Sequence, residues 1–220
     1  GVEPVGDAAP AGDAAAEVRV MPLADVSLAG EHNTSNVLAA VAVGLLHDVP
    51  PAAIRRAVRG FSGVEHRLEP VAEVDGVRFV NDSMGTQPDA VIAALRAFEP
   101  PIVLIAGGRA KGLALDELAQ VVAQRAAAVL LLGESADDMQ RTFGAAGAQR
   151  IERVPDMAAA VVRGAALAHE LLSSGVGREP ATVLLSPAAA SFDMFVDYAA
   201  RGLAFKRAVA DLTAAGEQEQ

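Results

Sequence analysis

The sequence predicts an α/β fold, with a mostly parallel sheet covered by helices on both faces and preceded by a short piece of another domain. Beyond residue 69, short apolar runs typical of strands alternate with segments of helical periodicity. Hydrophobic residues make up 52% of the 220 residues, which is enough for a sizeable core. Aromatic residues account for only 4%, whereas Ala, Val and Leu are abundant and let helices pack closely on a sheet.

The N-terminal part of the chain does not share this alternation. Residues 1–17 are rich in Gly, Ala, Pro and Asp, and they predict a loop or a poorly ordered end. A helix is expected to start near Thr34, with Asn33 and Thr34 as candidate N-caps. A second, shorter helix is expected to begin at the proline pair 50–51 and to end at Gly60.

A domain boundary is expected near Gly63, which separates residues 1–63 from residues 64–220. Soon after it, Asp75 and Gly76 lie between two apolar runs and predict a β-hairpin. The alternating segments that follow are expected to be helix 88–98, strand 102–106, helix 115–127, strand 129–132, helix 136–143, strand 151–154, helix 157–172, strand 182–185 and helix 192–210.

Charge and composition argue against several classes of function. The formal net charge is -10 and the pI is about 4.8, whereas a nucleic-acid partner normally requires a basic face. The chain has no Cys, so disulfides, thiolate metal sites and thiol nucleophiles are excluded. No uncharged apolar run approaches the roughly 18 residues that span a bilayer. We therefore expect a cytoplasmic protein without nucleic-acid or membrane partners.

The candidate site lies in the segments that follow the predicted strands, because open parallel sheets bind ligands beyond the C-terminal ends of their strands. Loops rich in Gly, Ser or Ala let backbone N–H groups approach a ligand, and helix N-termini favour anions. One of these loops adds Arg109 and Lys111, as a carboxylate or phosphate ligand would require. The four segments are NDSMGT (81–86), GGRAKG (107–112), GES (133–135) and SPAAASFD (186–193).

Each of these segments also has a purely structural interpretation. Gly107 and Gly108 fit a tight turn between strand and helix that leaves the basic side chains solvated. Ser191 or Asp193 fits the N-cap of the last helix, and Asp82 fits an ordinary turn former. On the residues alone, both kinds of interpretation stay open.

Metal and nucleotide motifs are absent from the sequence. The four His residues, at positions 32, 47, 66 and 169, form no pair at i, i+3 or i+4, so we expect no metal site. His66 lies next to Arg67 in the sequence, and its role as a ligand, a base or a structural hydrogen-bonding residue is left undecided by the sequence. The phosphate-binding pattern GxxxxGK[ST] is missing, and GGRAKG lacks both its spacing and the hydroxyl after Lys111.

Five segments in succession resemble the signatures of the Mur ligase family. The resemblance covers nearly the whole chain from Gly30 to Phe205, and its C-terminal segment is the most specific. The branch that the chain resembles most adds D-glutamate to UDP-N-acetylmuramoyl-L-alanine. The segments are GEHNTSNVLAAVA, GVEHRLE, FVNDSMGTQPDA, IAGGRAKG and LLSPAAASFDMFVDYAARGLAF.

The resemblance implies an ATP-dependent amide ligase of peptidoglycan precursor synthesis, which activates a carboxylate as an acyl phosphate. In that family one domain binds the UDP precursor, a central domain carries the phosphate-binding loop and the Mg²⁺ ligands, and a Rossmann-like third domain brings the amino acid. This chain would hold the C-terminal end of the central ATP-binding domain (1–63) and the Rossmann-like amino-acid-binding domain (64–220). It would be a fragment, inactive alone and monomeric, with ATP and Mg²⁺ as cofactors and the Mg²⁺ ligands in the missing part.

The resemblance also implies roles for individual residues. Asn33 and Asn36 would lie beside the adenine, Arg67 would contact the ATP phosphates, and Asp82 would hold the ribose. Lys111 and Arg67 would be the catalytic residues, because amide formation of this kind depends on positioning and charge neutralisation. The residues that would hold D-glutamate are Thr86, Lys111, Ser191, Phe192 and Tyr198.

Met84 departs from the family pattern, which usually has Lys at this position. Gly85 and Gln87 likewise stand where Ala and Asn are usual. Either Arg109 supplies the lost cation or the amino acid differs. Two alternatives to the D-glutamate ligase follow: a non-catalytic Rossmann-like ligand-binding module, and another ATP-dependent ligase of the superfamily, such as a later Mur enzyme or a folylpolyglutamate synthase.

Overall fold

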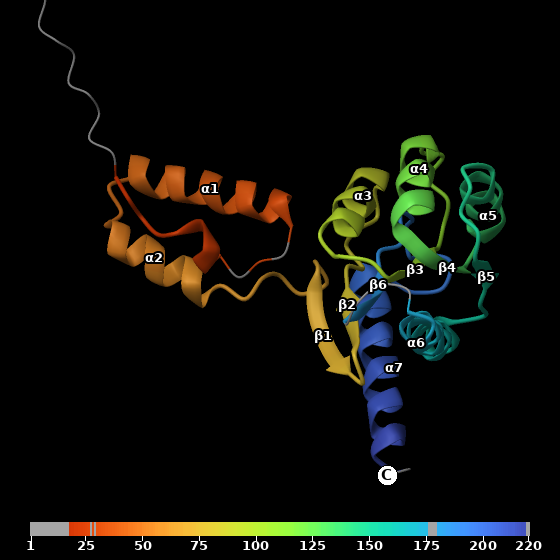
Figure 1. Ribbon diagram of the computed structural model, residues 1–220. Coiled ribbons are helices and arrows are strands. Elements are labelled where there is room, and N and C mark those ends of the chain that lie inside the picture. Colours follow the sequence, from red (N-terminus) through yellow and green to blue (C-terminus); the bar gives the residue numbers. More distant parts are fainter. Residues whose placement is uncertain (1–17, 27, 29, 176–179, 219–220) are drawn as a thin grey trace, which may run out of the picture.

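The structure, a computed structural model, describes residues 18–26, 28, 30–175 and 180–218. Two parts follow one another in the chain: a pair of helices, and then a larger unit built on a six-stranded sheet (Figure 1). A segment around Gly63 connects them. The loop expected over residues 1–17 lies outside the described residues.

The sheet of the larger unit is mostly parallel, as predicted. Its strands lie in the order β1-β2-β6-β3-β4-β5; β1 runs antiparallel to β2, and the other neighbouring pairs are parallel. The central strands are largely buried because helices cover both faces of the sheet. The strands are β1 (Glu69–Val74), β2 (Val77–Asn81), β3 (Ile102–Gly107), β4 (Ala126–Leu132), β5 (Ile151–Arg153) and β6 (Ala181–Leu185).

Two hydrophobic cores lie on opposite faces of this sheet. Helices α3, α4 and α5 pack on one face, and α6 and α7 pack on the other (Figure 1). Successive residues of β3 serve the two cores in turn, since Leu104 belongs to the first and Ile105 to the second. The helices are α3 (Pro88–Arg96), α4 (Asp116–Arg125), α5 (Ala136–Ala145), α6 (Met157–Ser173) and α7 (Tyr198–Gln218).

Most predicted elements of this unit are confirmed with small shifts at their ends. The hairpin turns at Asp75 and Gly76, so that Val74 pairs with Val77. The largest shift in a strand is in β4, which begins at Ala126 instead of Val129. Ala has a low strand propensity, and its inclusion follows from pairing with β3.

The prediction that the last helix begins at Phe192 is wrong. Helix α7 begins at Tyr198 and extends to Gln218, beyond the predicted end at residue 210. Asp197 caps it, because its Oδ1 accepts a hydrogen bond from the Ala200 N–H at 2.7 Å. The residues before Asp197 therefore form a segment between β6 and α7, and this segment belongs to the site described below.

The helix pair precedes the sheet unit. Helix α2 (Pro51–Gly60) has its predicted bounds, with proline at its start. Helix α1 (Glu31–Leu46) begins before the predicted start at Thr34, so the N-cap prediction for Asn33 and Thr34 is wrong. The N-cap is Gly30, whose carbonyl accepts a hydrogen bond from the Asn33 N–H at 3.0 Å.

Candidate functional site

The loops that follow β2, β3 and β6 meet at one edge of the sheet, as the sequence predicts. The Gly107 N–H donates a hydrogen bond to the Pro187 carbonyl at 2.9 Å, which joins the loops after β3 and β6. The Ala188 N–H donates to the Gly85 carbonyl, also at 2.9 Å, which joins the loops after β6 and β2. Backbone hydrogen bonds thus hold these loops together in a defined arrangement.

The loop after β3 requires glycine at position 108. Gly108 has a φ of 137°, and a Cβ there would lie 2.2 Å from the Ala190 carbonyl oxygen. The Arg109 N–H donates to that oxygen at 2.8 Å, and the Ser135 N–H donates to the Gly108 carbonyl at 2.8 Å. The tight-turn interpretation therefore holds for Gly108, and the same turn places the basic residues after it at the sheet edge.

Ser191 and Asp193 do not cap the last helix, contrary to one sequence interpretation. The Asp193 carboxylate accepts a hydrogen bond from the Glu134 N–H at 2.9 Å, which joins the segment after β6 to the loop after β4. Ser191 is buried, and its carbonyl accepts from the Phe195 N–H at 2.8 Å. Both residues thus shape the strand-end loops.

Asp82 is buried at the end of β2, only 4% exposed. Its Oδ2 accepts from Ser186 Oγ at 2.6 Å, and its Oδ1 accepts from the Leu68 N–H at 3.2 Å. Burial raises the pKa of the Asp82 carboxyl to about 6, although both hydrogen bonds and nearby Arg67 oppose that rise. A cavity of ≈ 250 Å³ lined in part by Asp82, Arg67 and Met84 opens here. A carboxylate in such a wall can accept hydrogen bonds from the hydroxyl groups of a ligand.

Lys111 reaches from the loop after β3 to the loop after β2. Its Nζ donates a hydrogen bond to the Thr86 carbonyl at 3.0 Å. Burial lowers the pKa of the Lys111 ammonium, and the charge of Arg201 lowers it further. Two of the predicted D-glutamate contacts are therefore neighbours. Arg109 is exposed, as Lys111 is, and its Nε lies 4.0 Å from the Glu134 carboxylate.

Phe192 and Tyr198 are also predicted to contact substrate. Phe192 lies in the segment between β6 and α7, and Tyr198 is the first residue of α7. Phe192 is 64% exposed and Tyr198 is 43% exposed. The Tyr198 carbonyl accepts a hydrogen bond from Ser83 Oγ at 2.7 Å, which ties the start of α7 to the loop after β2. The exposed parts of the two rings can offer apolar surface to a ligand.

Sequence reasoning missed Arg201, a buried cation beneath these loops, 1% exposed. It donates to Ser83 Oγ at 3.0 Å, to the Ser83 carbonyl at 2.9 Å and to the Ala189 carbonyl at 3.1 Å. Burial lowers the pKa of Arg201 to about 10, against the opposing effect of Asp193. A signal was present, because Arg201 lies one helical turn before the core residue Phe205, where a cation must find polar partners.

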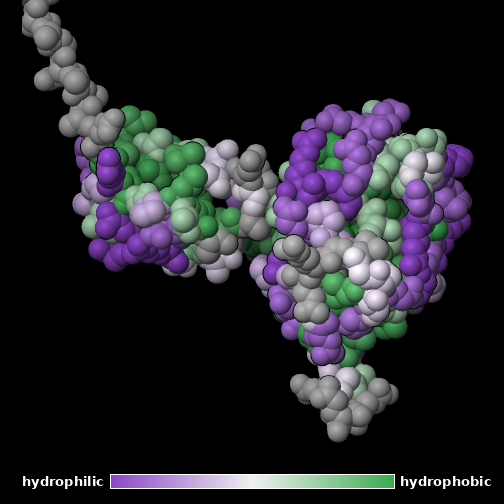
Figure 2. Space-filling view, in the orientation of Figure 1, coloured by the Kyte–Doolittle hydropathy of each residue, from purple (hydrophilic) through white to green (hydrophobic). Residues whose placement is uncertain are grey.

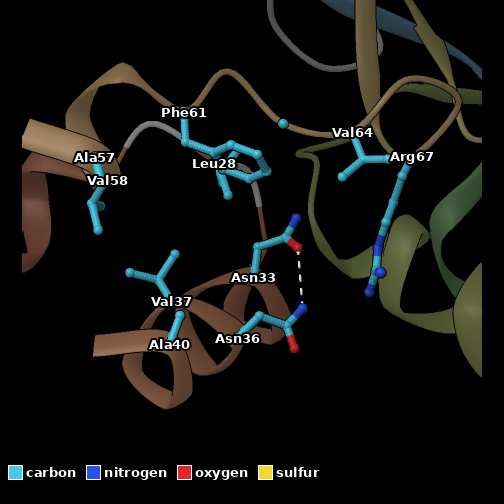
Figure 3. A pocket seen from close by; sticks show the side chains of 11 residues that line it. Leu28, Asn33, Asn36, Val37, Ala40, Ala57, Val58, Phe61, Val64 and Arg67 are labelled. Atoms are coloured by element: carbon cyan, nitrogen blue, oxygen red, sulfur yellow. Dashed lines mark hydrogen bonds between the residues drawn. The ribbon is translucent and has the colours of Figure 1, made fainter. Parts of the chain in front are cut away.

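A second hollow, of ≈ 480 Å³, lies between the helix pair and the connecting segment (Figure 3). Asn33 and Asn36 reach toward it from α1, and the Asn36 Nδ2 donates to the Asn33 Oδ1 at 3.5 Å. Arg67 lines the hollow from the side of the sheet unit and also lines the Asp82 cavity. The other lining residues are mostly apolar: Leu28, Val37, Ala40, Ala57, Val58, Phe61, Gly63 and Val64.

Glu65, His66 and Glu69 form a group that the sequence analysis did not identify, with possible metal-ligating atoms within 4.8 Å of one another. Lys206 Nζ donates to Glu65 Oε1 at 2.9 Å and to Glu69 Oε1 at 2.6 Å. The single ammonium group thus already binds both carboxylates. This group therefore fits a hydrogen-bonded network better than a Mg²⁺ site.

The fold and this geometry define an α/β protein that holds basic side chains at the C-terminal edge of its parallel strands, where α/β proteins of this kind bind ligands. Residues 66–189 match the family model described as "Mur ligase, glutamate ligase domain". The chain belongs to this family. The family resemblance found in the sequence is thereby confirmed.

Curated relatives match most of the chain. The UDP-N-acetylmuramoylalanine--D-glutamate ligase of Symbiobacterium thermophilum is 43% identical over 90% of this chain and 42% of that protein. The ligase of the same name from Caldicellulosiruptor saccharolyticus is 41% identical over 88% of this chain and 41% of that protein. The chain therefore spans about two fifths of the length of the curated relatives it matches.

Solved structures share the fold at low sequence identity. UDP-N-acetylmuramate-alanine ligase MurC from Thermotoga maritima matches with a TM-score of 0.60 and 19% identity, over 86% of this chain and 39% of that one. Folylpolyglutamate synthase from Mycobacterium tuberculosis, complexed with ADP, matches with a TM-score of 0.62 and 15% identity, over 83% and 41%. These matches confirm the predicted Rossmann-like α/β fold.

Proposed function

We propose that this chain is the C-terminal part of an ATP-dependent ligase that joins D-glutamate to UDP-N-acetylmuramoyl-L-alanine in peptidoglycan precursor synthesis. The observation that carries the proposal is the contact between Lys111 and Thr86 at the sheet edge, close to the buried cation of Arg201. Two cations suit an amino acid with two carboxylates. The curated relatives, which this chain matches over two fifths of their length, bear the name of this activity.

In this proposal, the hollow beside α1 receives the adenine of ATP. The amides of Asn33 and Asn36 offer donors and acceptors to a base, and the apolar lining suits the faces of its ring. Arg67 lines both this hollow and the Asp82 cavity, so it is placed to meet phosphates while Asp82 accepts hydrogen bonds from ribose hydroxyls. Mg²⁺ would accompany the ATP, with ligands outside this chain.

The proposed reaction couples ATP cleavage to amide formation. The substrate carboxylate takes the terminal phosphoryl group of ATP, which gives an acyl phosphate and ADP; the amine of D-glutamate then attacks the acyl carbon, and phosphate leaves. This chain contributes positioning and charge: Lys111 holds a glutamate carboxylate, Arg67 meets phosphate oxygens, and the hydroxyls of Thr86 and Ser191 donate hydrogen bonds. The rings of Phe192 and Tyr198 would cover the methylene groups.

The same proposal assigns residues 1–63 to the end of a central ATP-binding domain and residues 64–220 to the amino-acid-binding domain. Helix α1 supports this assignment because it exposes large apolar side chains, such as Leu38 at 56% and Leu46 at 81%. Figure 2 shows hydrophobic surface over this helix. Apolar surface of this kind is expected to be covered by the remainder of a larger domain.

We further propose that the enzyme works as a monomer in the cytoplasm, where ATP is available. Within the described ranges, no helix combines the length and the apolar character needed to cross a membrane. The net charge of -10 supports the expectation that nucleic acid is not a partner.

Met84 favours one second candidate, a binding module that has kept the fold and lost the reaction. Met84 stands where the family usually has Lys, and it is 39% exposed beside Asp82 and Arg67. A ligase for another amino acid would also explain this difference. The D-glutamate ligase is preferred because relatives with that name are more than 40% identical to this chain.

Phosphate release by the full-length gene product tests the proposal. Release should require MgATP, UDP-N-acetylmuramoyl-L-alanine and D-glutamate together, and it should stop when any one is omitted. Release that continues without D-glutamate would contradict the ligase. If the protein is folded but releases no phosphate with any amino acid, the binding module becomes the preferred function.

A further inference from the structure

The backbone on either side of Arg67 has an uncommon conformation. His66 has a φ of 66° and Leu68 has a φ of 44°, both in the left-handed region that non-glycine residues rarely adopt. Both residues are buried, at 5% and 7% exposure. Such conformations persist only where the surroundings impose them, and they concentrate at functional sites. The segment thus presents Arg67 in a shape that other residues must maintain.

Hydrogen bonds to the backbone maintain this shape. The His66 N–H donates to Glu69 Oε2 at 2.9 Å, and the Leu68 N–H donates to Asp82 Oδ1 at 3.2 Å. The His66 carbonyl accepts from the Met84 N–H at 3.0 Å. Each neighbour of Arg67 is therefore fixed to the sheet unit, and one bond runs to the loop that leads to Thr86.

The contacts of Asn81 indicate which nitrogen of the His66 ring accepts a hydrogen bond. The Asn81 Oδ1 accepts from the Ser83 N–H at 3.1 Å, so its Nδ2 must be the donor. That Nδ2 lies 2.9 Å from His66 Nδ1 and 2.9 Å from Glu69 Oε2. His66 Nδ1 is therefore an acceptor, which corresponds to the tautomer with the proton on Nε2, and Nε2 lies 3.9 Å from Glu65 Oε1.

Helix α7 completes the arrangement from the opposite side. Lys206 Nζ holds Glu65 and Glu69 at 2.9 and 2.6 Å. Burial raises the pKa of the Glu69 carboxyl, but hydrogen bonds from Lys206, the His66 N–H and Asn81 outweigh burial and leave that pKa below its ordinary value. Glu69 is thus held as a carboxylate, and the Lys206 pKa is raised by its bonds to Glu69 and Glu65.

The packing of α7 on His66 is close. A Cβ at Gly202 would lie 2.3 Å from His66 Nδ1 and 3.0 Å from Asn81 Nδ2. Tyr198, one turn earlier, meets the His66 ring edge-on, with ring centroids 6.1 Å apart and an interplanar angle of 79°. The imidazole therefore belongs to the residue next to Arg67, a proposed phosphate contact, and it packs against Tyr198, a proposed D-glutamate contact.

We propose that His66, Glu69, Asn81 and Lys206 form a positioning network. This network orients Arg67 toward the nucleotide phosphates and connects it to the loop after β2, which leads to Thr86. The inference rests on the proposed function for the role of Arg67. The arrangement of the network itself stands on hydrogen bonds, burial and backbone angles. These residues act through Arg67 and the loop after β2, so they are positioning residues.

The tautomer of His66 tests the network without any substrate. Nitrogen-15 NMR of the histidine-labelled chain at pH 8, with His66 assigned by a His66→Gln variant, should show the proton on Nε2 and an unprotonated, hydrogen-bonded Nδ1. A proton on Nδ1, or a rapidly exchanging mixture of tautomers, would overturn the network. This result does not depend on turnover, so it separates failure of the network from failure of the proposed function.

Gly202→Ala tests the close packing, and Gly216→Ala is its matched control on the same helix. A Cβ at Gly216 would meet no atom within 4 Å. Gly202→Ala should shift the His66 nitrogen signals and weaken ADP binding by the full-length gene product about tenfold, whereas Gly216→Ala should change neither. Unchanged signals and ADP binding in Gly202→Ala would overturn the packing argument.

Lys206 variants separate positioning from mere stability. In the full-length gene product, Lys206→Met should raise the KM for MgATP about tenfold with a smaller change in kcat, and Lys206→Arg should recover most of the loss. If the protein shows no turnover, the dissociation constant of ADP is the readout for the same variants. An unchanged KM and ADP affinity in Lys206→Met, or equal losses in the Met and Arg variants, would overturn the proposal.

Discussion

Arg201 on α7 donates two hydrogen bonds to Ser83, at 3.0 Å to its Oγ and at 2.9 Å to its carbonyl, although 118 residues separate them in sequence. Ser83 follows β2 in the loop that leads to Thr86. A buried charge on the last helix is thus hydrogen-bonded to a loop of the candidate site. The donated bonds go to neutral oxygens, and the anion that acts on this charge within the chain is Asp193.

Replacement of Arg201 by Met should lower the free energy of unfolding by about 3 kcal/mol, because buried oxygens of Ser83 and Ala189 lose their donors. Arg207→Met, an exposed position on the same helix, is the control and should change stability by less than about 0.5 kcal/mol. Urea unfolding of both variants measures the difference. Equal stability of the two variants would contradict the role assigned to Arg201.

Asp82 should make stability depend on pH. Burial raises the pKa of its carboxyl from 3.8 to about 6, so between these values the folded state binds more protons than the unfolded state. This contribution to stability is present at low pH and is lost as the pH rises through about 6. Asp82→Asn removes it, so the stability of the variant relative to the parent should rise by roughly 2 kcal/mol between pH 4.5 and pH 7.5.

Urea unfolding of the parent and of Asp82→Asn at a series of pH values measures this effect. The exposed Asp89→Asn is the control, and its stability relative to the parent should vary little over the same range. A constant difference between Asp82→Asn and the parent would show that Asp82 titrates alike in the folded and unfolded states.

Lys111 should matter more to the amino-acid substrate than Arg109. Lys111 is hydrogen-bonded to Thr86 at the sheet edge, whereas the Arg109 side chain lies 4.0 Å from the Glu134 carboxylate. In the full-length gene product, Lys111→Met should raise the KM for D-glutamate at least about tenfold, and Arg109→Met should raise it less than about threefold. Larger effects from Arg109→Met would indicate instead that Arg109 supplies the cation that Met84 lacks.

Met84→Lys should lower the KM for D-glutamate, because it restores a cation beside a dianionic substrate. Met84→Leu keeps the apolar character and should leave the KM unchanged. Steady-state kinetics of the full-length gene product with both variants measure the effect. An unchanged or raised KM in Met84→Lys would show that Met84 is adapted to a different amino acid or to none.

The sheet unit could be predicted closely because its strands and helices carry strong local signals. Local sequence predicts the turn at Asp75 and Gly76 and the buried strand that the structure places at 102–107. The meeting of the loops at one edge of the sheet follows from parallel topology. The start of α7 could not be predicted in this way. Asp193 is an equally good N-cap by type, and only its long-range bond to the Glu134 N–H assigns the cap to Asp197.

Part of the candidate site could likewise be predicted from the sequence, and part could not. Lys111 and Thr86 were expected to contact the same ligand, and they lie in contact. Arg201 and the network around His66 were missed in part because some of their contacts join residues more than 100 positions apart, such as Arg201 with Ser83 and Lys206 with Glu69. Left-handed backbone at Leu68 leaves no signal in a single sequence, because Leu does not favour it, and His66 leaves only a weak one, since His adopts it more often than most residues but still uncommonly.

The amino acid specificity of the full-length gene product tests the central claim most directly. With MgATP and UDP-N-acetylmuramoyl-L-alanine, mass spectrometry of the nucleotide-linked product should show addition of D-glutamate. L-glutamate, D-aspartate and meso-diaminopimelate should give little or no product. Product with one of these other amino acids and none with D-glutamate would contradict the claim, and Met84 would then mark a changed specificity.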